Sequence, residues 1–419
     1  MTSASEPNEA AEAGDGSKLT RLIEEHTRLG ARFAEFAGWR MPLWYSGASD
    51  EHAAVRNAAG LFDIGHMGLL EVTGAASADF LDAVSTADVR SIETGRCRYA
   101  FLLDPQGLPL DDIIIYRLAP THFLLVVNAA NAVKVRGWLD ATVLGRAPLD
   151  PDDPSSAREF AASLRDLSAH SDPECLAGLA LQGPESARAL AGMLDTPGAL
   201  DGLARFELTQ TSLLGMPAII SRTGYTGEST GYEIFVPVDE SPTVWRAILD
   251  AGEALGVLPA GLAARDSLRI ESGLPLYGHE LAGPHEITPL GAGYERFVEF
   301  GKDFFVGRDA LIRREEARQG QIARFRLDTG TARAIRSEDP IGSRRGRMVG
   351  RVTSCALAGD IQFGMAWVES SAAAEGAELL LYPARHLERS ADLSDVSALE
   401  PGDWLPLHES ATVLPRFPR

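Results

Sequence analysis

The sequence has 419 residues, of which 45% are hydrophobic and 23% charged, as is typical of a globular protein of two or three domains. A formal net charge of -20 argues against nucleic acid or an anionic membrane as a partner, because both require clustered Lys and Arg. Cys97, Cys175 and Cys355 lie far apart, a spacing that suggests no disulfide framework and no zinc cluster and favours a reducing compartment.

The first 17 residues are acidic and rich in small residues, which predicts a disordered tail. This segment has no apolar stretch typical of a secretory signal, and its acidity argues against a mitochondrial transit peptide. No run of about twenty apolar residues occurs, so we expect no transmembrane helix. Together these features predict a cytoplasmic protein.

In the first half of the chain, hydrophobic periodicity predicts both helices and strands. The helices are expected at 19–36, 50–59, 76–84 and 131–142, with an extended loop MPLWYSG after the first. The strands are expected at 68–73, 98–103, 112–118 and 122–127. The last two strands are joined by the short loop APT, which indicates an antiparallel hairpin.

In the second half, a Pro- and Asp-rich segment at 147–157 indicates a surface linker or an inserted loop. Helices are expected at 185–193, 244–253 and 264–272, and strands at 211–214, 217–221 and 232–237. From about Gly320 the pattern changes to strands separated by Gly- and Arg-rich turns, which predicts a mostly antiparallel C-terminal barrel.

Several common catalytic motifs are missing from the sequence. There is no P-loop, no dinucleotide fingerprint, no H-E-x-x-H or paired-Cys metal motif, and no G-x-S-x-G elbow. We therefore expect no metal site, and chemistry that depends on scattered polar groups in a cleft.

Two segments in the first half carry candidate polar groups. GLFDIGHMG places His66 between glycines, where a structural hydrogen-bonding role is the more common one. LPLDDIIIYRL places Asp111 and Asp112 at the start of a β-branched strand, so that one should face solvent and the other an interior cleft. An inward carboxylate there would have a raised pKa suited to acid–base work, whereas a simple strand-start pair is equally compatible with the residues.

Two later segments are also candidates. SRTGYTGESTGYEIFVP is either a Gly-rich hairpin or a ring-binding loop in which Tyr225 packs on a heterocycle and Glu233 accepts hydrogen bonds from its edge. GLAARDSLRIESGLPLYGHEL places Arg265 and Arg269 on one helix face. These arginines either bind a carboxylate-bearing ligand or belong to a solvated network with nearby acids.

Taken together, these segments resemble the glycine cleavage T-protein (aminomethyltransferase) family. The resemblance covers roughly residues 19–312 and is carried, in family order, by FAGWRMPLWY, EHAAVRNAAGLFDIGHMG, LDDIIIYR, VVNAAN, LALQGP, SRTGYTGE, GLAARDSLRIESGLPLYGHEL, TPLGAGYERFV and FVGRDAL. It implies an α+β fold of three domains in a ring-like arrangement, with mostly antiparallel sheets and folate in a central channel. We therefore expect a tail at 1–17, a folate-binding region of two intertwined α+β domains at 18–312, and a C-terminal β-barrel domain at 313–419.

The resemblance also implies roles for particular residues. Asp112 matches the carboxylate that the family places near N10 of folate and to which it assigns the catalytic role. Glu233 matches the acid that binds the pterin edge. The remaining expected tetrahydrofolate contacts are Met67, Tyr99, Tyr116, Asn128, Tyr225 and Arg265.

The family reaction moves a methylene group from an aminomethyl-lipoyl H-protein to tetrahydrofolate and releases ammonia. This sequence departs from the family pattern after VVNAAN and after RVTS, where CALA replaces the usual segment. Two alternatives therefore remain open. One is a folate-dependent demethylase or one-carbon transferase acting on a small methylated substrate, and the other is a non-catalytic folate-binding module.

Overall fold

The computed structural model describes residues 16–150, 153–169, 171–327, 334–383, 402–403 and 408–418. The chain divides into two compact units. The first unit consists of Met1–Pro105, Leu110–Arg265 and Glu299–Val306, and the second of Gln106–Pro109, Asp266–Val298 and Gly307–Arg419. Most of the predicted tail lies outside the described residues. The predicted domain boundaries at 17 and 312 stay predictions.

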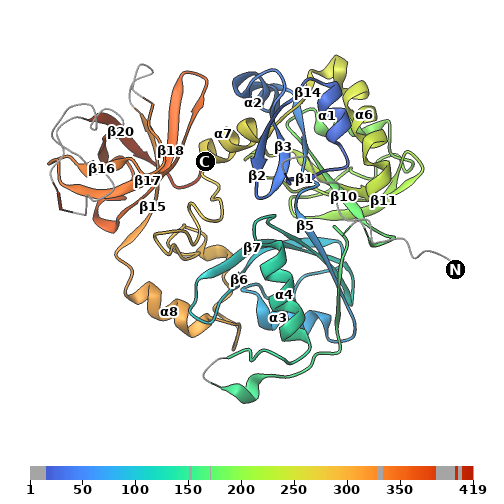
Figure 1. Cartoon of the computed structure of the whole chain (residues 1–419), viewed down its shortest axis with the longest axis horizontal. Coiled ribbons are helices and arrows are strands. Elements are labelled where there is room, and N and C mark those ends of the chain that lie inside the picture. The colour runs from blue at the N-terminus through green and yellow to red at the C-terminus, as the bar shows by residue number, and fades with distance from the viewer. Residues whose placement is uncertain are drawn as a thin grey trace. The chain divides into compact units, whose positions relative to one another are not determined.

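The first unit contains three β-sheets (Figure 1). The three-stranded sheet has the order β1-β3-β2, with bounds Lys18–Leu19, Trp39–Trp44 and Arg32–Phe36. The six-stranded sheet has the order β11-β12-β13-β10-β4-β14, with bounds Leu208–Leu213, Met216–Ser221, Gly231–Pro237, Leu176–Gln182, Ala59–Asp63 and Val257–Pro259. The five-stranded sheet has the order β6-β7-β8-β5-β9, with bounds Arg96–Leu103, Pro109–Ala119, His122–Val127, Gly68–Thr73 and Ser163–Asp166.

Helices cover these sheets. Their bounds are Ile23–Arg28 for α1, Ala48–Asn57 for α2, Ser77–Val84 for α3, Ala132–Val143 for α4, Ser186–Ala191 for α5 and Ser241–Gly252 for α6. Helices α3 and α4 pack on the five-stranded sheet, where Phe80 and Leu139 join Ile113 and Ile115 in one hydrophobic core. A second core in the same unit is built around Trp245 and the buried face of the six-stranded sheet.

The second unit contains a closed barrel of order β15-β18-β17-β16-β19-β20. Its strands span Gly320–Leu327, Ile361–Glu369, Met348–Ala358, Pro340–Ser343, Glu378–Leu381 and Glu409–Leu414. Helix α8, Arg308–Glu316, belongs to the same unit, and helix α7, Leu262–Glu271, continues from the first unit into the second. Closure leaves no unpaired sheet edge, and the barrel interior is filled by apolar side chains such as Phe325 and Ile341.

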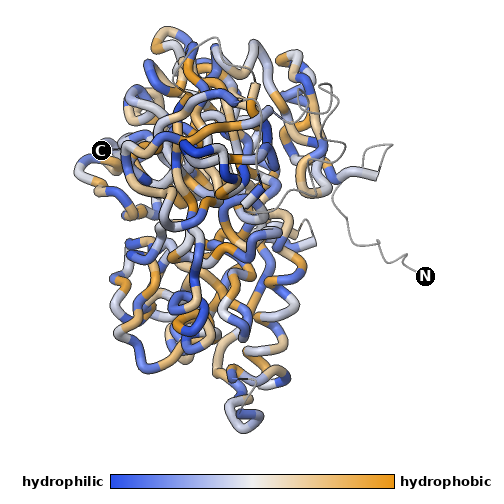
Figure 2. The backbone as a smooth tube through the Cα atoms, turned by 90° about the vertical axis from the view of Figure 1, so that its left-hand side faces the viewer, coloured by the Kyte–Doolittle hydropathy of each residue, from blue (hydrophilic) through white to orange (hydrophobic). Residues whose placement is uncertain are grey.

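Most sequence-based elements are confirmed. The α+β class, the mostly antiparallel sheets, the hairpin of β7 and β8, and the C-terminal barrel are all present. Two strand pairs with a defined register are parallel, β1 with β3 and β4 with β14. Figure 2 shows hydrophobic and hydrophilic residues interleaved along the chain, as expected for strands and helices with one buried face. Among the described residues, no helix has both the length and the apolar character needed to cross a bilayer.

The helix predicted over 19–36 is wrong in its second half. Helix α1 ends at Arg28, and Gly30 follows with a φ of 75°, a left-handed conformation that glycine adopts without strain. The chain then enters β2, whose residue Phe36 pairs with Trp39 of β3. The segment expected as a loop from Met41 is therefore part of a strand, because pairing between neighbouring segments overrides the helical spacing of the apolar residues.

Candidate active site

Strand β7 presents two different faces to its surroundings. Asp111, Ile113 and Ile115 are buried on the face that packs on the hydrophobic core. Asp112 is half-buried on the opposite face, which it shares with Tyr116, because alternate residues of a strand point the same way. The expectation that one carboxylate faces solvent is therefore wrong, since helix α4 and its N-terminal turn cover the face that carries Asp111.

Asp111 is a structural anchor for the turn that begins helix α4. Its carboxylate accepts hydrogen bonds from the backbone N–H of Asn128 at 2.9 Å and from the Asn128 side-chain amide at 2.8 Å. Asn131, the residue that precedes α4, donates a third hydrogen bond at 2.6 Å. Asp111 therefore ties β7 to the turn after β8, and its oxygens are already occupied by the protein.

Asp112 is held in one orientation by two neighbours. The Tyr99 hydroxyl donates to Oδ2 at 2.8 Å, and the Asn128 amide donates to Oδ1 at 2.9 Å. Burial raises the pKa of Asp112, while these hydrogen bonds and the positive charge of Arg265 oppose that rise. Burial also raises the pKa of Asp111, and the charge of Asp112 raises it further. The two carboxyl groups thus form a coupled pair whose ionisation is resisted by their surroundings.

Glu233 lies on β13 and reaches the same face of β7 from the six-stranded sheet. Its Oε2 accepts a hydrogen bond from Tyr116 at 2.8 Å and another, very short, from Thr223. Burial and the charge of Glu233 raise the pKa of Tyr116 well above its usual range, so this tyrosine stays a donor at neutral pH. Within the described part of the chain, Oε1 of Glu233 has no hydrogen-bond partner and keeps its capacity to accept from a ligand.

The two carboxylates come from different strands, Asp112 from β7 and Glu233 from β13. Asp112 and Tyr116 are four residues apart on the same face of β7, a separation of about 13 Å along an extended strand. Because Tyr116 donates a hydrogen bond to Glu233, the Glu233 carboxylate lies beside the Tyr116 end of this face and Asp112 at the other end. This spacing suits an elongated ligand.

The loop between β12 and β13 is pinned by Gln182, a residue that the sequence reasoning missed. The Gln182 amide donates to the carbonyl of Thr223 at 3.1 Å and accepts from the Thr226 hydroxyl at 3.0 Å. A Cβ atom at Gly224 would lie 1.8 Å from this amide, and one at Gly231 would lie 2.6 Å from it. The signal in the sequence is a polar residue that ends the apolar strand LAGLALQ, and buried polar groups of this kind require specific partners.

The two arginines of α7 have different roles. The Arg265 guanidinium lies 4.9 Å from the ring centre of Tyr225, a cation–π contact that orients both side chains. Arg269 instead lies in the second unit, where it donates to Glu280 at 2.7 Å and to Ser354 at 2.8 Å. The two arginines therefore do not share one binding face. The alternative of a network with nearby acids is confirmed in part, because Arg269 also pairs with the half-exposed Asp266 at 2.8 Å.

His66 is buried beside the half-buried Met67, and its Nδ1 has no hydrogen-bond partner among the described residues. Its ring packs edge-on against Phe36 at 5.6 Å. Burial and the nearby charge of Arg265 together lower the pKa of His66 to about 4, although the charge of Asp63 opposes the shift. The imidazole is therefore neutral at physiological pH.

We expect His66 to make stability depend on pH. The pKa is about 4 in the folded protein and about 6.5 in an unfolded chain, so the unfolded state binds more protons between these values. The contribution is complete above pH 6.5 and is lost as pH falls towards 4, by up to about 3 kcal/mol. Denaturant unfolding of wild type and His66→Gln from pH 7 to 4 should show a shallower decline in the variant. Parallel declines would contradict this assignment.

In sum, hydrogen bonds bring Tyr99, Asp112 and Asn128 together, and a second group joins Tyr116 to Glu233. The charge of Arg265 acts on both Asp112 and His66, which places the Arg265–Tyr225 pair near the first group. All of these residues belong to the first unit. Their roles towards a ligand stay predictions.

Comparisons with known proteins show the family to which the chain belongs. The sequence model of the GCVT N-terminal domain family matches residues 22–302. An aminomethyltransferase of Streptomyces coelicolor is 40% identical over 86% of this chain and 92% of its own length, and one of Symbiobacterium thermophilum is 39% identical over the same shares. The crystal structure of the glycine cleavage system aminomethyltransferase T of Bartonella henselae superposes with a TM-score of 0.77 at 30% identity, covering 95% of this chain and 97% of that one. The chain therefore belongs to the glycine cleavage T-protein (GCVT) family.

Proposed function

We propose that this protein is a tetrahydrofolate-dependent aminomethyltransferase of glycine cleavage, which moves a methylene group from an aminomethyl-lipoyl carrier protein to tetrahydrofolate and releases ammonia. Membership of the family and the names of its relatives support the reaction class. The observation that supports it most directly is the pair of carboxylates held by tyrosines, Asp112 by Tyr99 and Glu233 by Tyr116.

The donor and acceptor groups of this face fit a folate. One oxygen of Glu233 is held by Tyr116 and Thr223, so the other is aimed and available for the N–H groups of an amino-pyrimidinone edge. Tyr225, oriented by Arg265, offers a ring face for stacking, and Met67 offers an adaptable apolar surface. Tetrahydrofolate supplies, when bound, the nitrogen nucleophile that accepts the one-carbon unit.

Asp112 is the residue that we assign to catalysis. Tyr99 and Asn128 hold its two oxygens, so the carboxylate is oriented before the reaction and needs no reorganisation during it. An oriented carboxylate in a partly buried site stabilises positive charge that develops on a nearby nitrogen or carbon. Its raised pKa also allows it to hold a proton at Oδ1 or Oδ2 closer to neutral pH than an exposed aspartate would.

The reaction can be tested with the purified protein. We expect it to release ammonia and form 5,10-methylenetetrahydrofolate only when both tetrahydrofolate and aminomethyl-lipoylated H-protein are supplied. Folate binding without this product, but with folate methylation from methylated amines or sulfonium compounds, would identify a demethylase instead. Folate binding with neither product would identify a non-catalytic module.

Removal of the Glu233 carboxylate should weaken folate binding. We expect Glu233→Ala to lose about 1–3 kcal/mol of binding free energy, because the hydrogen bonds to the ligand edge lose their acceptor. Calorimetric titration with tetrahydrofolate measures this change.

The matched control for that titration is Glu207→Gln. Glu207 is also partly buried, and it pairs with Arg96 at 2.8 Å. We expect its affinity for tetrahydrofolate to equal that of wild type. Equal affinity of the Glu233 variant and wild type would remove Glu233 from the binding site.

A further inference from the structure

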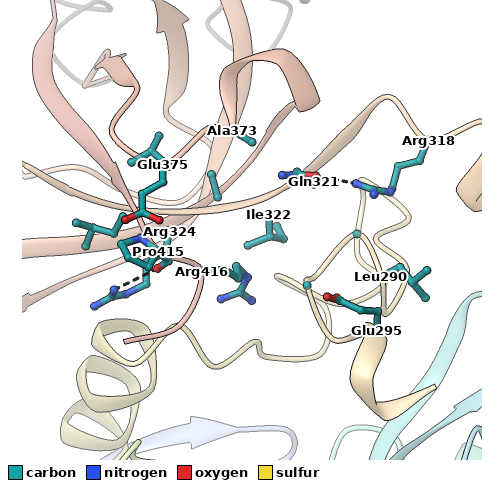
Figure 3. A pocket seen from close by; sticks show the side chains of 15 residues that line it. Leu290, Glu295, Arg318, Gln321, Ile322, Arg324, Ala373, Glu375, Pro415 and Arg416 are labelled. Atoms are coloured by element: carbon teal, nitrogen blue, oxygen red, sulfur yellow. Dashed lines mark hydrogen bonds between the residues drawn. The ribbon is translucent and has the colours of Figure 1, made fainter. Parts of the chain in front are cut away.

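A cavity of about 400 Å³ lies within the second unit, against the barrel. It is lined by the start of β15, by the chain around Val413–Arg416 and by the loop around Leu290–Glu295. In the view of Figure 3, Arg416 lies between Arg324 and Glu295. A volume of this size is within the range of small-molecule sites, about 300–1,000 Å³.

Two arginines that line this cavity have no carboxylate partner among the described residues. Arg324 is 7% exposed, donates a long hydrogen bond of 3.4 Å to the carbonyl of Pro415 and lies 5.6 Å from the ring centre of Phe363, while its buried Nε has no hydrogen-bond partner there. Arg416 donates to the carbonyls of Ala292, at 2.9 Å, and Gly273 and lies 4.6 Å from the ring centre of Phe417, while its Nη2 has no hydrogen-bond partner in the described ranges. Across the described ranges, neither guanidinium forms an ion pair.

Arg318 lines the same cavity and provides a contrast. It forms an ion pair with Glu315 at 2.7 Å and donates to the side chain of Gln321 at 3.0 Å. Its charge is therefore neutralised within the protein. Glu295 and Glu375 also line the cavity, but within the described part of the chain neither Arg324 nor Arg416 forms an ion pair with them.

The unpaired positive charges influence each other. Burial, together with the charge of Arg416, lowers the pKa of Arg324 to about 10, while the charge of Glu271 opposes the shift. Burial also lowers the pKa of Arg416, with Glu280 and Glu295 among the groups that oppose it. Both side chains remain cations at neutral pH. A desolvated charge without a partner is unfavourable, and two such charges side by side favour a bound counter-anion.

We propose that this cavity binds a small oxyanion, the carboxylate or phosphate group of a metabolite, through Arg324 and Arg416. Guanidinium groups recognise both kinds of oxyanion through paired N–H donors. Ile322, Ala373 and Val413 add an apolar wall that accommodates the uncharged part of a small ligand. The inference does not depend on the proposed one-carbon transfer, because every residue of the cavity belongs to the second unit.

Thermal unfolding in the presence of anions tests this proposal. Inorganic phosphate and glutarate serve as probes, with sodium chloride at equal ionic strength as the baseline. We expect at least one probe to raise the unfolding midpoint of the wild-type protein by about 2–5 °C at saturation, because a ligand that binds only the folded state stabilises it. Phosphate alone identifies a phosphate site, glutarate alone a carboxylate site, and both a general oxyanion site.

Arg324→Gln is the decisive variant, since it gives up one long hydrogen bond and one cation–π contact with Phe363. In this variant the anion-dependent shift of the unfolding midpoint should be absent. Without anion, the variant should unfold at the same midpoint as wild type or higher, because one of two repelling charges has been removed. The control Arg318→Gln should keep the full shift. No shift with either probe in the wild-type protein, or an undiminished shift in Arg324→Gln, would overturn the proposal. A crystal grown with phosphate should show the anion against Arg324.

Discussion

Replacement of Asp112 by Asn is expected to reduce turnover by roughly 10²–10⁴-fold while the protein remains folded. The amide is close in size to the carboxylate and still accepts a hydrogen bond from Tyr99 or Asn128 through its carbonyl oxygen. It carries no negative charge and cannot hold a transferable proton, so the stabilisation of developing positive charge is lost. Steady-state rates of 5,10-methylenetetrahydrofolate formation measure the effect.

The pH dependence of the same reaction gives an independent readout. Burial raises the pKa of Asp112, so a carboxylate that must be ionised loses activity as pH falls through that raised value. The acid limb of the pH–rate profile should disappear in Asp112→Asn, and the residual rate should be flat there. Turnover within a factor of two of wild type, or an unchanged acid limb, would exclude Asp112 as the catalytic group.

Replacement of Arg269 by Leu is expected to lower the free energy of unfolding by about 3–5 kcal/mol. Arg269 and Glu280 are both nearly inaccessible to solvent, with side-chain exposures of 2% and 0%. Without the arginine, Glu280 keeps hydrogen bonds from Thr353 at 2.6 Å and from the backbone of Leu276 at 3.1 Å but becomes an uncompensated buried charge. Urea unfolding at neutral pH measures the loss.

Two controls separate the buried charge from the loss of packing. Asp266→Asn removes the other, half-exposed partner of Arg269 and should cost less than about 1 kcal/mol. The double variant Arg269→Leu/Glu280→Leu should be more stable than Arg269→Leu, since it removes both charges. A double variant as unstable as the single one would show that packing, and not charge, dominates.

The dependence of stability on pH below neutrality also reports the charge of Glu280. Burial would raise the pKa of Glu280, but the charge of Arg269 and hydrogen bonds outweigh it and lower that pKa. Because the folded value is depressed, the contribution is present above the unfolded value of about 4.5 and is lost as pH falls through the folded value. The stability difference between wild type and Arg269→Leu should therefore shrink below about pH 4.5.

Local pattern was sufficient to predict the elements that are built from a single segment. The β7–β8 hairpin and helices α3 and α4 lie close to their predicted bounds, because the apolar periodicity and the turn residues agree there. The segment after Arg28 was predicted wrongly because its apolar spacing fits a helix as well as it fits a strand. What decides between them is the pairing of β2 with β3, a contact that no single window of sequence contains.

The candidate site shows the same limit. The resemblance pointed to Asp112 and Glu233, but what brings Glu233 to the strand of Asp112 is a tertiary contact, since Tyr116 and Glu233 are 117 positions apart in sequence. Residue spacing alone does not say which of Asp111 and Asp112 faces the site. The turn before α4 makes the difference, because its hydrogen bonds occupy Asp111 as a structural anchor and leave Asp112 as the candidate catalyst. Residue spacing likewise predicted one shared face for Arg265 and Arg269, although the two side chains contact different residues.

The tight packing of Gln182 against Gly224 and Gly231 has a consequence for anyone who would redesign the substrate preference of this protein. A side chain introduced at Gly224 or Gly231 alone must displace the Gln182 amide that holds the loop. Positions 182, 224 and 231 are therefore best varied together. A smaller residue at 182 makes room for the side chain that is introduced opposite it.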